Sequence, residues 1–175
     1  CSPPQDTEQG VLILGAAGQR VVTAGEFLGL AGMYAGLQAS QKNDYPITVL
    51  TGHSVSEVIL SPEPIDYTGL SKPSVVIVLA QEGINRRKDD FAAWPEATVV
   101  FRAGSDLDLP STQAQVVDLD LKTKGIKKAD YALASLAALA QGEKVLNREM
   151  LESAIDLRFP PKIAEASRKV VEAVT

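Results

Sequence analysis

Few residues of this chain have the types and spacing that catalysis requires. Ser54 follows His53 directly, but neighbouring residues of a strand point to opposite faces, so the two side chains cannot form a serine–histidine hydrogen bond. Asp118 and Asp120 share one face at the end of a predicted strand, where carboxylates more often solvate a loop than catalyse. Cys1 is the single cysteine, too few for an iron–sulfur or zinc centre. We therefore expect no catalytic and no metal-ligating residue on this chain.

The clearest binding feature is a glycine turn that follows an apolar run. Residues 11–14 (VLIL) are typical of a strand buried on both faces, and Gly15 and Gly18 end the run. Apolar residues then recur at helical spacing, so a helix begins near residues 18–20, and its free N–H groups and dipole favour an anion. The spacing is neither GxGxxG nor a Walker loop. A tight turn whose glycines serve only close packing stays open as an alternative.

A series of strands and helices must position this turn. A continuous β-branched run makes residues 74–79 the clearest strand, and the first helix extends to about Gly36. Further strands are predicted at residues 37–42, 54–60, 97–101 and 114–119, the last two buried. Further helices are predicted at residues 81–91, 127–141, 148–155 with Asn147 as its cap, and 160–174. The order predicts an α/β fold: a three-layer, Rossmann-like domain with a mostly parallel sheet and a helical C-terminal segment.

In such sheets ligands bind outside the carboxyl ends of the strands. The turn at residues 15–21 and the loop at residues 45–54 are the candidates for that edge. Residues 122–128 (KTKGIKK) are the predicted hinge.

Length and composition limit the class of protein. A chain of 175 residues that is 45% apolar supports one well-buried domain, so we expect a flexible leader over residues 1–10 and one domain over 11–175. The net charge of −5 argues against a nucleic-acid partner, which needs a basic face. No apolar run reaches the roughly 20 residues that span a membrane, so we expect no membrane segment and a cytoplasmic location. Cys1 at the first position predicts numbering that starts after processing or inside a longer product, and a lipid-anchored binding protein is an alternative.

Three sequence blocks follow one another in a fixed order. Residues 15–21 read GAAGQRV with TAG at 23–25, residues 45–54 read YPITVLTGHS with VILS at 58–61 and PI at 64–65, and residues 73–82 read PSVVIVLAQE. These blocks resemble GxGGQGV with TAG, YGPExRGGxS with VxIS and PI, and PDVLVALSQE of one family. The family is that of the 2-oxoacid:acceptor oxidoreductases, and the blocks belong to its gamma subunit or gamma domain. The resemblance extends over residues 11–155.

The resemblance implies a non-catalytic subunit of a complex that oxidatively decarboxylates a 2-oxoacid. In that family the domain is similar to a lid that helps bind coenzyme A over the thiamine site. Thiamine diphosphate and [4Fe-4S] clusters are expected on partner subunits, because this chain lacks a GDG…N motif and the cysteines. The implied partners are alpha, beta and ferredoxin-like delta subunits. The residues that the resemblance assigns to cofactor binding are Gly15, Gly18, Gln19, Arg20, Tyr45, Thr51, Gly52, His53 and Ser54.

The chain departs from the family blocks at the positions suited to an anion. Leu50 stands where the family has arginine, Thr51 where it has the first glycine, and Thr48 where it has glutamate. In the glycine turn, Ala17 and Arg20 replace glycines. A phosphate facing leucine has no charge partner, so Arg20 is expected to supply a charge instead. A lid with a purely structural role is the alternative.

A stand-alone nucleotide-binding or regulatory α/β module is the second function that the strand–turn–helix would allow. An acidic residue about 20 positions beyond the glycines, at the end of a second strand, is the usual ribose ligand of such modules. Asn43-Asp44 comes near that position. Binding of NAD or ATP to the isolated chain would favour this reading.

Overall fold

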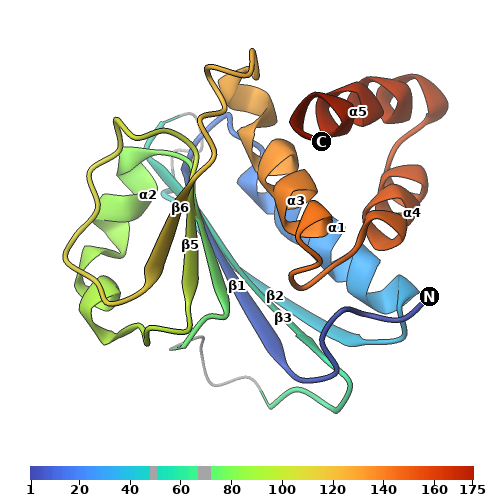
Figure 1. Ribbon diagram of the computed structural model, residues 1–175, viewed down its shortest axis with the longest axis horizontal. Coiled ribbons are helices and arrows are strands. Elements are labelled where there is room, and N and C mark those ends of the chain that lie inside the picture. Colours follow the sequence, from blue (N-terminus) through green and yellow to red (C-terminus); the bar gives the residue numbers. More distant parts are fainter. Residues whose placement is uncertain (48–50, 67–71) are drawn as a thin grey trace.

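The computed structural model describes residues 1–47, 51–66 and 72–175. A six-stranded sheet lies between two layers of helices (Figure 1). The strands are β1 (Gln9–Ala16), β2 (Gln38–Asp44), β3 (His53–Ser61), β4 (Val75–Val78), β5 (Val99–Arg102) and β6 (Gln115–Asp118). The helices are α1 (Val21–Tyr34), α2 (Gln81–Arg86), α3 (Tyr131–Gln141), α4 (Arg148–Arg158) and α5 (Pro161–Val174), with short 3₁₀ helices at Lys88–Ala93 (η1) and Lys128–Asp130 (η2).

The strand order is β2-β3-β1-β4-β5-β6. The pairs β1–β4, β4–β5 and β5–β6 are parallel, whereas β3 is antiparallel to both of its neighbours, β1 and β2. Among the described strands β3 therefore runs opposite to the rest, which confirms the mostly parallel sheet. The hairpin between β2 and β3 consequently returns the chain to the carboxyl end of β1, where Ala16 pairs with His53.

Alternate residues of the central strands build two cores. Val11 and Ile13 of β1 face α1, α3, α4 and α5, whereas Leu12 and Leu14 face α2 and η1. All four side chains are fully or almost fully buried. A strand covered on both faces requires a continuous apolar run, which is why residues 11–14 carry no polar side chain. The two cores confirm the predicted three-layer α/β arrangement.

Three expectations about single elements need correction. The strand expected as buried at residues 114–119 is the short edge strand β6, where Val116 and Val117 are 41% and 40% exposed because it has a neighbour on one side only. The helix expected over residues 81–91 is divided into α2 and η1 at Arg87. The helix expected from residue 127 starts as η2 and becomes α-helical at Tyr131.

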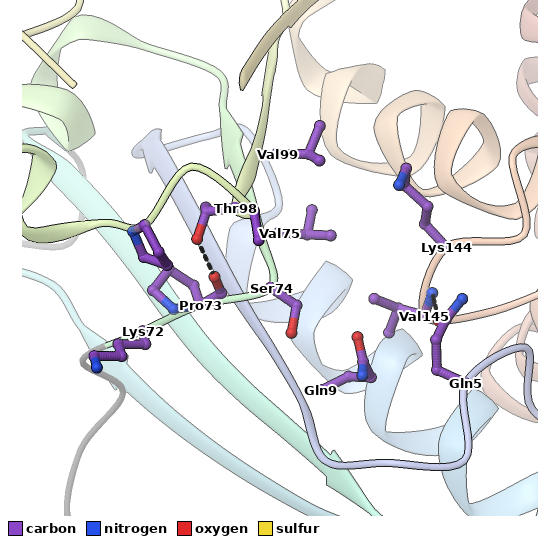
Figure 2. A pocket seen from close by; sticks show the side chains of 12 residues that line it. Gln5, Gln9, Lys72, Pro73, Ser74, Val75, Thr98, Val99, Lys144 and Val145 are labelled. Carbon is purple, nitrogen blue, oxygen red and sulfur yellow. Dashed lines mark hydrogen bonds between the residues drawn. The ribbon is translucent and has the colours of Figure 1, made fainter. Parts of the chain in front are cut away.

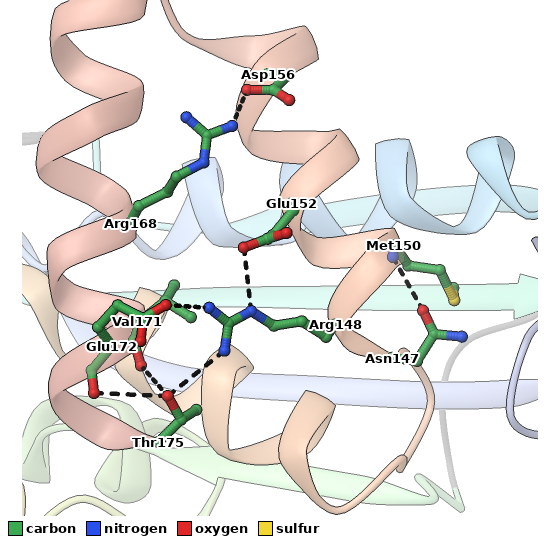
Figure 3. Close-up of polar contacts among 9 residues, drawn as sticks. All are labelled: Asn147, Arg148, Met150, Glu152, Asp156, Arg168, Val171, Glu172 and Thr175. Atoms are coloured by element: carbon green, nitrogen blue, oxygen red, sulfur yellow. Dashed lines mark hydrogen bonds and ion pairs between the residues drawn. The ribbon is translucent and has the colours of Figure 1, made fainter.

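The C-terminal helices are fastened by capping and by ion pairs (Figure 3). Asn147 accepts a hydrogen bond from the Met150 N–H at 3.0 Å, as expected of a helix cap. Arg148 contacts Glu152 of its own helix at 3.1 Å and joins α4 to α5 by its ion pair with Glu172. These contacts fix α5 against the α3 and α4 layer, together with its buried residues Ala164, Ser167 and Val171.

The first residues of the chain contact the turn between α3 and α4. Gln5 donates to the Glu143 carbonyl at 2.9 Å and accepts from the Val145 N–H at 2.6 Å. β1 begins at Gln9, two residues before the expected start of the domain. The flexibility expected of residues 1–10 stays a prediction.

Candidate functional site

The glycine turn and the loop between β2 and β3 are joined by a backbone hydrogen bond. The Ala17 N–H donates to the Gly52 carbonyl at 3.0 Å. Gly18 (φ +88°) and Gly52 (φ +96°) both adopt the left-handed conformation that favours glycine. Arg20, with φ +59°, caps α1 without a side-chain hydrogen bond to the helix. The two regions that the sequence named separately therefore form one surface at the carboxyl end of β1.

Gly15 and Gly18 serve different physical purposes. A Cβ atom at Gly15 would lie 2.6 Å from Cγ2 of Val21, so this glycine permits close packing of α1 on β1. A Cβ atom at Gly18 would meet nothing within 4 Å, so its positive φ is what requires glycine. The packing explanation left open by the sequence holds for Gly15 and not for Gly18.

A pocket of about 290 Å³ lies between the turn and the loop. It brings together six of the nine residues expected to bind a cofactor, namely Gly18, Arg20, Tyr45, Thr51, His53 and Ser54. Gly15, Gln19 and Gly52 are not among the residues that line it. We call this the glycine-turn pocket.

Gln19 is occupied by the protein itself. Its Oε1 accepts from the Ala16 N–H at 2.9 Å, and its Nε2 donates to the Leu79 carbonyl at 3.2 Å. The side chain is buried, so both ends of the amide connect the carboxyl ends of β1 and β4. Its contribution to the glycine-turn pocket is to fix the turn that forms one wall.

Two basic side chains line the glycine-turn pocket. Nη1 of Arg20 lies 3.5 Å from Oδ1 of Asp130, and the Arg20 side chain is 64% exposed, so this contact is loose. Nε2 of His53 lies 3.5 Å from Oδ1 of Asp44, whose other oxygen accepts from Nε of Arg86 at 2.9 Å. The hydrogen bond from Arg86, followed by that from His53, lowers the pKa of Asp44 despite some desolvation. An anion in the pocket would thus meet Arg20 at its mouth and an imidazole held by a carboxylate on its wall.

The remaining residues with potential for chemistry have other contacts. His53 and Ser54 are consecutive in β3, so their side chains leave the strand on opposite faces. Asp118 forms a bidentate pair with Arg102 at 2.5 and 3.0 Å across β5 and β6. Leu50 and Thr48, the positions where the chain departs from its family blocks, lie outside the described residues.

Sequence reasoning missed a larger cavity on the other side of the glycine turn. It measures about 860 Å³ and lies at the carboxyl ends of β1, β4, β5 and β6. The two cavities share Ala16, Ala17 and Gly18, so the turn forms a wall between them. Small residues directly after the strands, such as Ala80 and Ala103-Gly104, were the available signal. We call this the sheet-edge cavity.

A third cavity, of about 350 Å³, lies at the opposite end of the sheet (Figure 2). Several of its polar groups are engaged within the protein. Thr98 Oγ1 donates to the Pro73 carbonyl at 2.6 Å, and Ser74 Oγ accepts from the Gly10 N–H at 3.4 Å. Gln5 forms hydrogen bonds with the turn before α4, as described above. We therefore interpret this cavity as a packing gap between the first strand and the helical layer.

Within residues 1–47, 51–66 and 72–175, no three His, Cys, Asp or Glu side chains gather as a metal site would require. No helix in the same ranges is long and apolar enough to cross a bilayer.

Comparison with known proteins adds to this geometry. The family described as pyruvate ferredoxin/flavodoxin oxidoreductase matches residues 10–175. The 2-oxoglutarate synthase subunit KorC of Methanocaldococcus jannaschii is 31% identical over 156 residues, which cover 83% of this chain and 80% of that protein. The similarity therefore extends well beyond the glycine turn.

Solved structures give the same picture of the fold. The keto/oxoacid ferredoxin oxidoreductase gamma subunit of Geobacter sulfurreducens has a TM-score of 0.76 at 27% identity, covering 95% of this chain and 94% of that one. The 2-oxoglutarate:ferredoxin oxidoreductase of Magnetococcus marinus, solved with 2-oxoglutarate, coenzyme A and succinyl-CoA bound, has a TM-score of 0.77 at 15% identity. This chain corresponds to 31% of that longer chain. At such identity the likeness concerns the fold alone.

Proposed function

The chain belongs to the pyruvate ferredoxin/flavodoxin oxidoreductase family as a gamma-type member, and from that premise we propose that it supplies a coenzyme A contact to a 2-oxoacid oxidoreductase complex. In this proposal the complex oxidatively decarboxylates a 2-oxoacid, and this chain is a non-catalytic subunit. The observation that carries the proposal is the hydrogen bond from Ala17 to Gly52. It joins both altered family blocks around one pocket lined by Arg20 and His53.

Arg20 is the residue on which the coenzyme A contact depends. Its guanidinium is exposed at the mouth of the glycine-turn pocket, and its contact with Asp130 is long at 3.5 Å. Replacing the contact with Asp130 by a contact with phosphate loses little free energy, because an exposed ion pair contributes at most about 1 kcal/mol to stability. A charge-assisted hydrogen bond to phosphate contributes about 1.5–3 kcal/mol, so the exchange favours binding.

The redox groups of the proposed complex do not fit this chain. A [4Fe-4S] cluster takes four cysteine thiolates, and the chain has one cysteine, which is exposed. We therefore assign the clusters and thiamine diphosphate to the alpha, beta and ferredoxin-like delta partners. A cytoplasmic location of the complex stays a prediction.

Purification under native conditions tests whether this chain is a subunit of such a complex. The chain, tagged at its C-terminus and expressed from its own genomic locus, is expected to elute with larger subunits that contain thiamine diphosphate and iron. The pure complex should reduce ferredoxin with a 2-oxoacid, and 2-oxoglutarate is the first acid to assay because the similar KorC protein is named for it. An 18.6 kDa monomer without such partners would contradict the proposal.

A further inference from the structure

The single histidine of the chain lies where three elements meet. His53 is the first residue of β3, Asp44 is the last residue of β2, and Arg86 is the last residue of α2. Asp44 pairs with Val55, so Asp44 and His53 stand at the two ends of the β2–β3 connection. The His53 side chain is 18% exposed and lines the glycine-turn pocket, whereas Asp44 and Arg86 do not. The ring at the wall of the pocket is therefore held by residues outside it.

Asp44 connects the histidine ring to α2. Nε2 of His53 lies 3.5 Å from Oδ1 of Asp44, and Arg86 donates to both oxygens of the same carboxylate, at 2.9 Å from Nε and 3.5 Å from Nη2. The hydrogen bond from Arg86 lowers the pKa of Asp44 below 3.8, so this side chain is ionised at neutral pH. An ionised carboxylate can accept a hydrogen bond but cannot donate one. The nitrogen that faces it must be the donor, which places the ring proton on Nε2.

The other ring nitrogen is left for a ligand. Nδ1 of His53 has no hydrogen-bond partner in the described part of the chain. No buried side-chain nitrogen there lacks a partner, so Nδ1 is accessible on a side chain that lines the glycine-turn pocket. When the proton is on Nε2, Nδ1 of a neutral ring is an acceptor.

The charges around the ring favour its neutral form. The negative charge of Asp44 is already matched by Arg86. Arg20 lines the same pocket and is positive, so a protonated His53 would add a second positive charge beside it. The two side chains therefore have different tasks: Arg20 can meet an anionic group, and His53 can accept a hydrogen bond from a neutral one.

We propose that Asp44 and Arg86 are positioning residues that fix the proton of His53 on Nε2, so that Nδ1 accepts a hydrogen bond from an N–H or O–H group of the ligand in the glycine-turn pocket. The ligand contact rests on the proposed function, in which that ligand is coenzyme A. The fixing of the ring does not, because it follows from contacts within this chain.

Nitrogen-15 NMR of the full chain with isotope-labelled histidine tests the positioning, and a single histidine makes the assignment unambiguous. At about pH 7.5, above the range in which a free imidazole titrates, we expect a proton on Nε2 and the chemical shift of an unprotonated nitrogen for Nδ1. In Asp44→Asn the amide can either donate or accept, so the two nitrogen shifts should move toward each other. In Arg86→Gln the carboxylate has no other cation, so the doubly protonated ring should become more populated.

Matched controls remove the same charges nearby without touching the ring. Asp89→Asn and Lys88→Gln lie at exposed positions of η1 and should leave the histidine spectrum unchanged. The backbone amide spectrum of each variant reports that the fold is retained. A wild-type ring with its proton on Nδ1 would overturn the proposal, and so would an Asp44→Asn spectrum identical to that of the wild type.

Steady-state kinetics of the purified complex test the ligand contact. His53→Ala should raise the KM for coenzyme A about three- to tenfold, the effect of one lost neutral hydrogen bond, with a smaller change in kcat. His53→Asn can place an amide oxygen near the position of Nδ1 and should recover part of this loss, whereas His53→Gln extends toward the position of Nε2 and should not. Asp44→Asn should raise the same KM about two- to fivefold.

The two variants of the pocket separate the possible failures. A KM that rises in Arg20→Ala but not in His53→Ala would overturn the contact at Nδ1 and leave the proposed function standing. A KM unchanged in both would contradict the coenzyme A contact and the ligand role of His53 together, and the NMR result would then concern the ring position alone.

Discussion

The side-chain amide of Gln19 donates a 3.2 Å hydrogen bond to the carbonyl of Leu79, sixty positions along the chain. Because the same amide also accepts from the Ala16 N–H, it fixes the carboxyl end of β1 to that of β4. This connection fixes the turn between the glycine-turn pocket and the sheet-edge cavity, so the shape of both depends on it.

Replacing Gln19 by alanine is expected to lower the free energy of unfolding by about 1–3 kcal/mol, because a buried N–H and a buried carbonyl both lose their partner. Gln19→Glu should be no better, since it places a carboxylate oxygen against the Leu79 carbonyl. Urea unfolding checks both. Gln38→Ala, on the exposed side of β2, is the control and should change little. A Gln19→Glu protein as stable as the wild type at neutral pH would contradict the assigned hydrogen bond.

Gly83→Ala is expected to destabilise the fold by about 1–3 kcal/mol, because the added Cβ would lie 2.5 Å from the backbone N of Gly15 and from the carbonyl carbon of Leu14. Helix α2 would have to move away from β1. Gly29→Ala in α1 is a matched control with the opposite sign: its Cβ would meet only Ala39 at 3.8 Å, and alanine stabilises a helix by about 0.5–1 kcal/mol. Thermal unfolding of the two variants measures this difference. Similar shifts of the unfolding temperature in both would contradict the close approach of α2 to β1.

Arg20→Ala is expected to raise the KM of the complex for coenzyme A about tenfold or more while subunit assembly stays intact. Asp130→Asn releases Arg20 from its 3.5 Å contact and should lower that KM or leave it unchanged. Arg168→Ala, which breaks an ion pair between α5 and α4 far from the pocket, is the control for loss of a surface charge. Steady-state kinetics with coenzyme A varied provide the measurement. An unchanged KM in Arg20→Ala would assign the phosphate contact to other chains.

Asp118→Asn should destabilise the protein at neutral pH and have no effect at low pH. The hydrogen bond from Arg102 lowers the pKa of Asp118 below its ordinary value of 3.8, so the pair stabilises the fold above that value and loses this stabilisation as pH falls through the folded-state pKa. Since Asp118 is 38% exposed, solvent screening limits the effect to about 0.5–1 kcal/mol. Urea unfolding at pH 7 and at a series of decreasing pH values below 3.8 tests this, and the difference between variant and wild type should shrink along the series. Asp89→Asn, at an exposed position of η1, is the control, and a Asp118→Asn difference that persists at the lower pH would contradict the mechanism.

The elements themselves could be predicted from local patterns. The run at residues 11–14 predicts a doubly covered strand because every side chain there must be buried, and Asn147 predicts a helix start because its oxygen accepts from the backbone N–H three residues later. The predictions fail where the burial that a local pattern suggests differs from the burial that the neighbouring elements provide. Val116 and Val117 read as core residues, but an edge strand leaves them exposed.

The candidate site could be predicted in its parts and not in its assembly. Gly18 and Gly52 were recognisable from the family blocks, but the hydrogen bond from Ala17 to Gly52 exists only because β3 returns antiparallel to β1. Gln19 was expected to contact a ligand, whereas the fold uses both ends of its amide. Whether the hydrogen-bonding groups of a side chain are left for a ligand depends on which distant strand end lies beside it. The sequence contains no local signal for that.

The sequence by itself determined the α/β class, the two-sided burial of β1, the glycine turn and the family blocks, since each depends on residues close together along the chain. The tertiary structure decided the strand order, the side of the turn on which each pocket lies, and the sheet-edge cavity, which Lys122, Lys128 and Tyr131 help to line. Those features arise from pairing between strands far apart in sequence, and that pairing is selected by the packing of both cores at once rather than by any single segment.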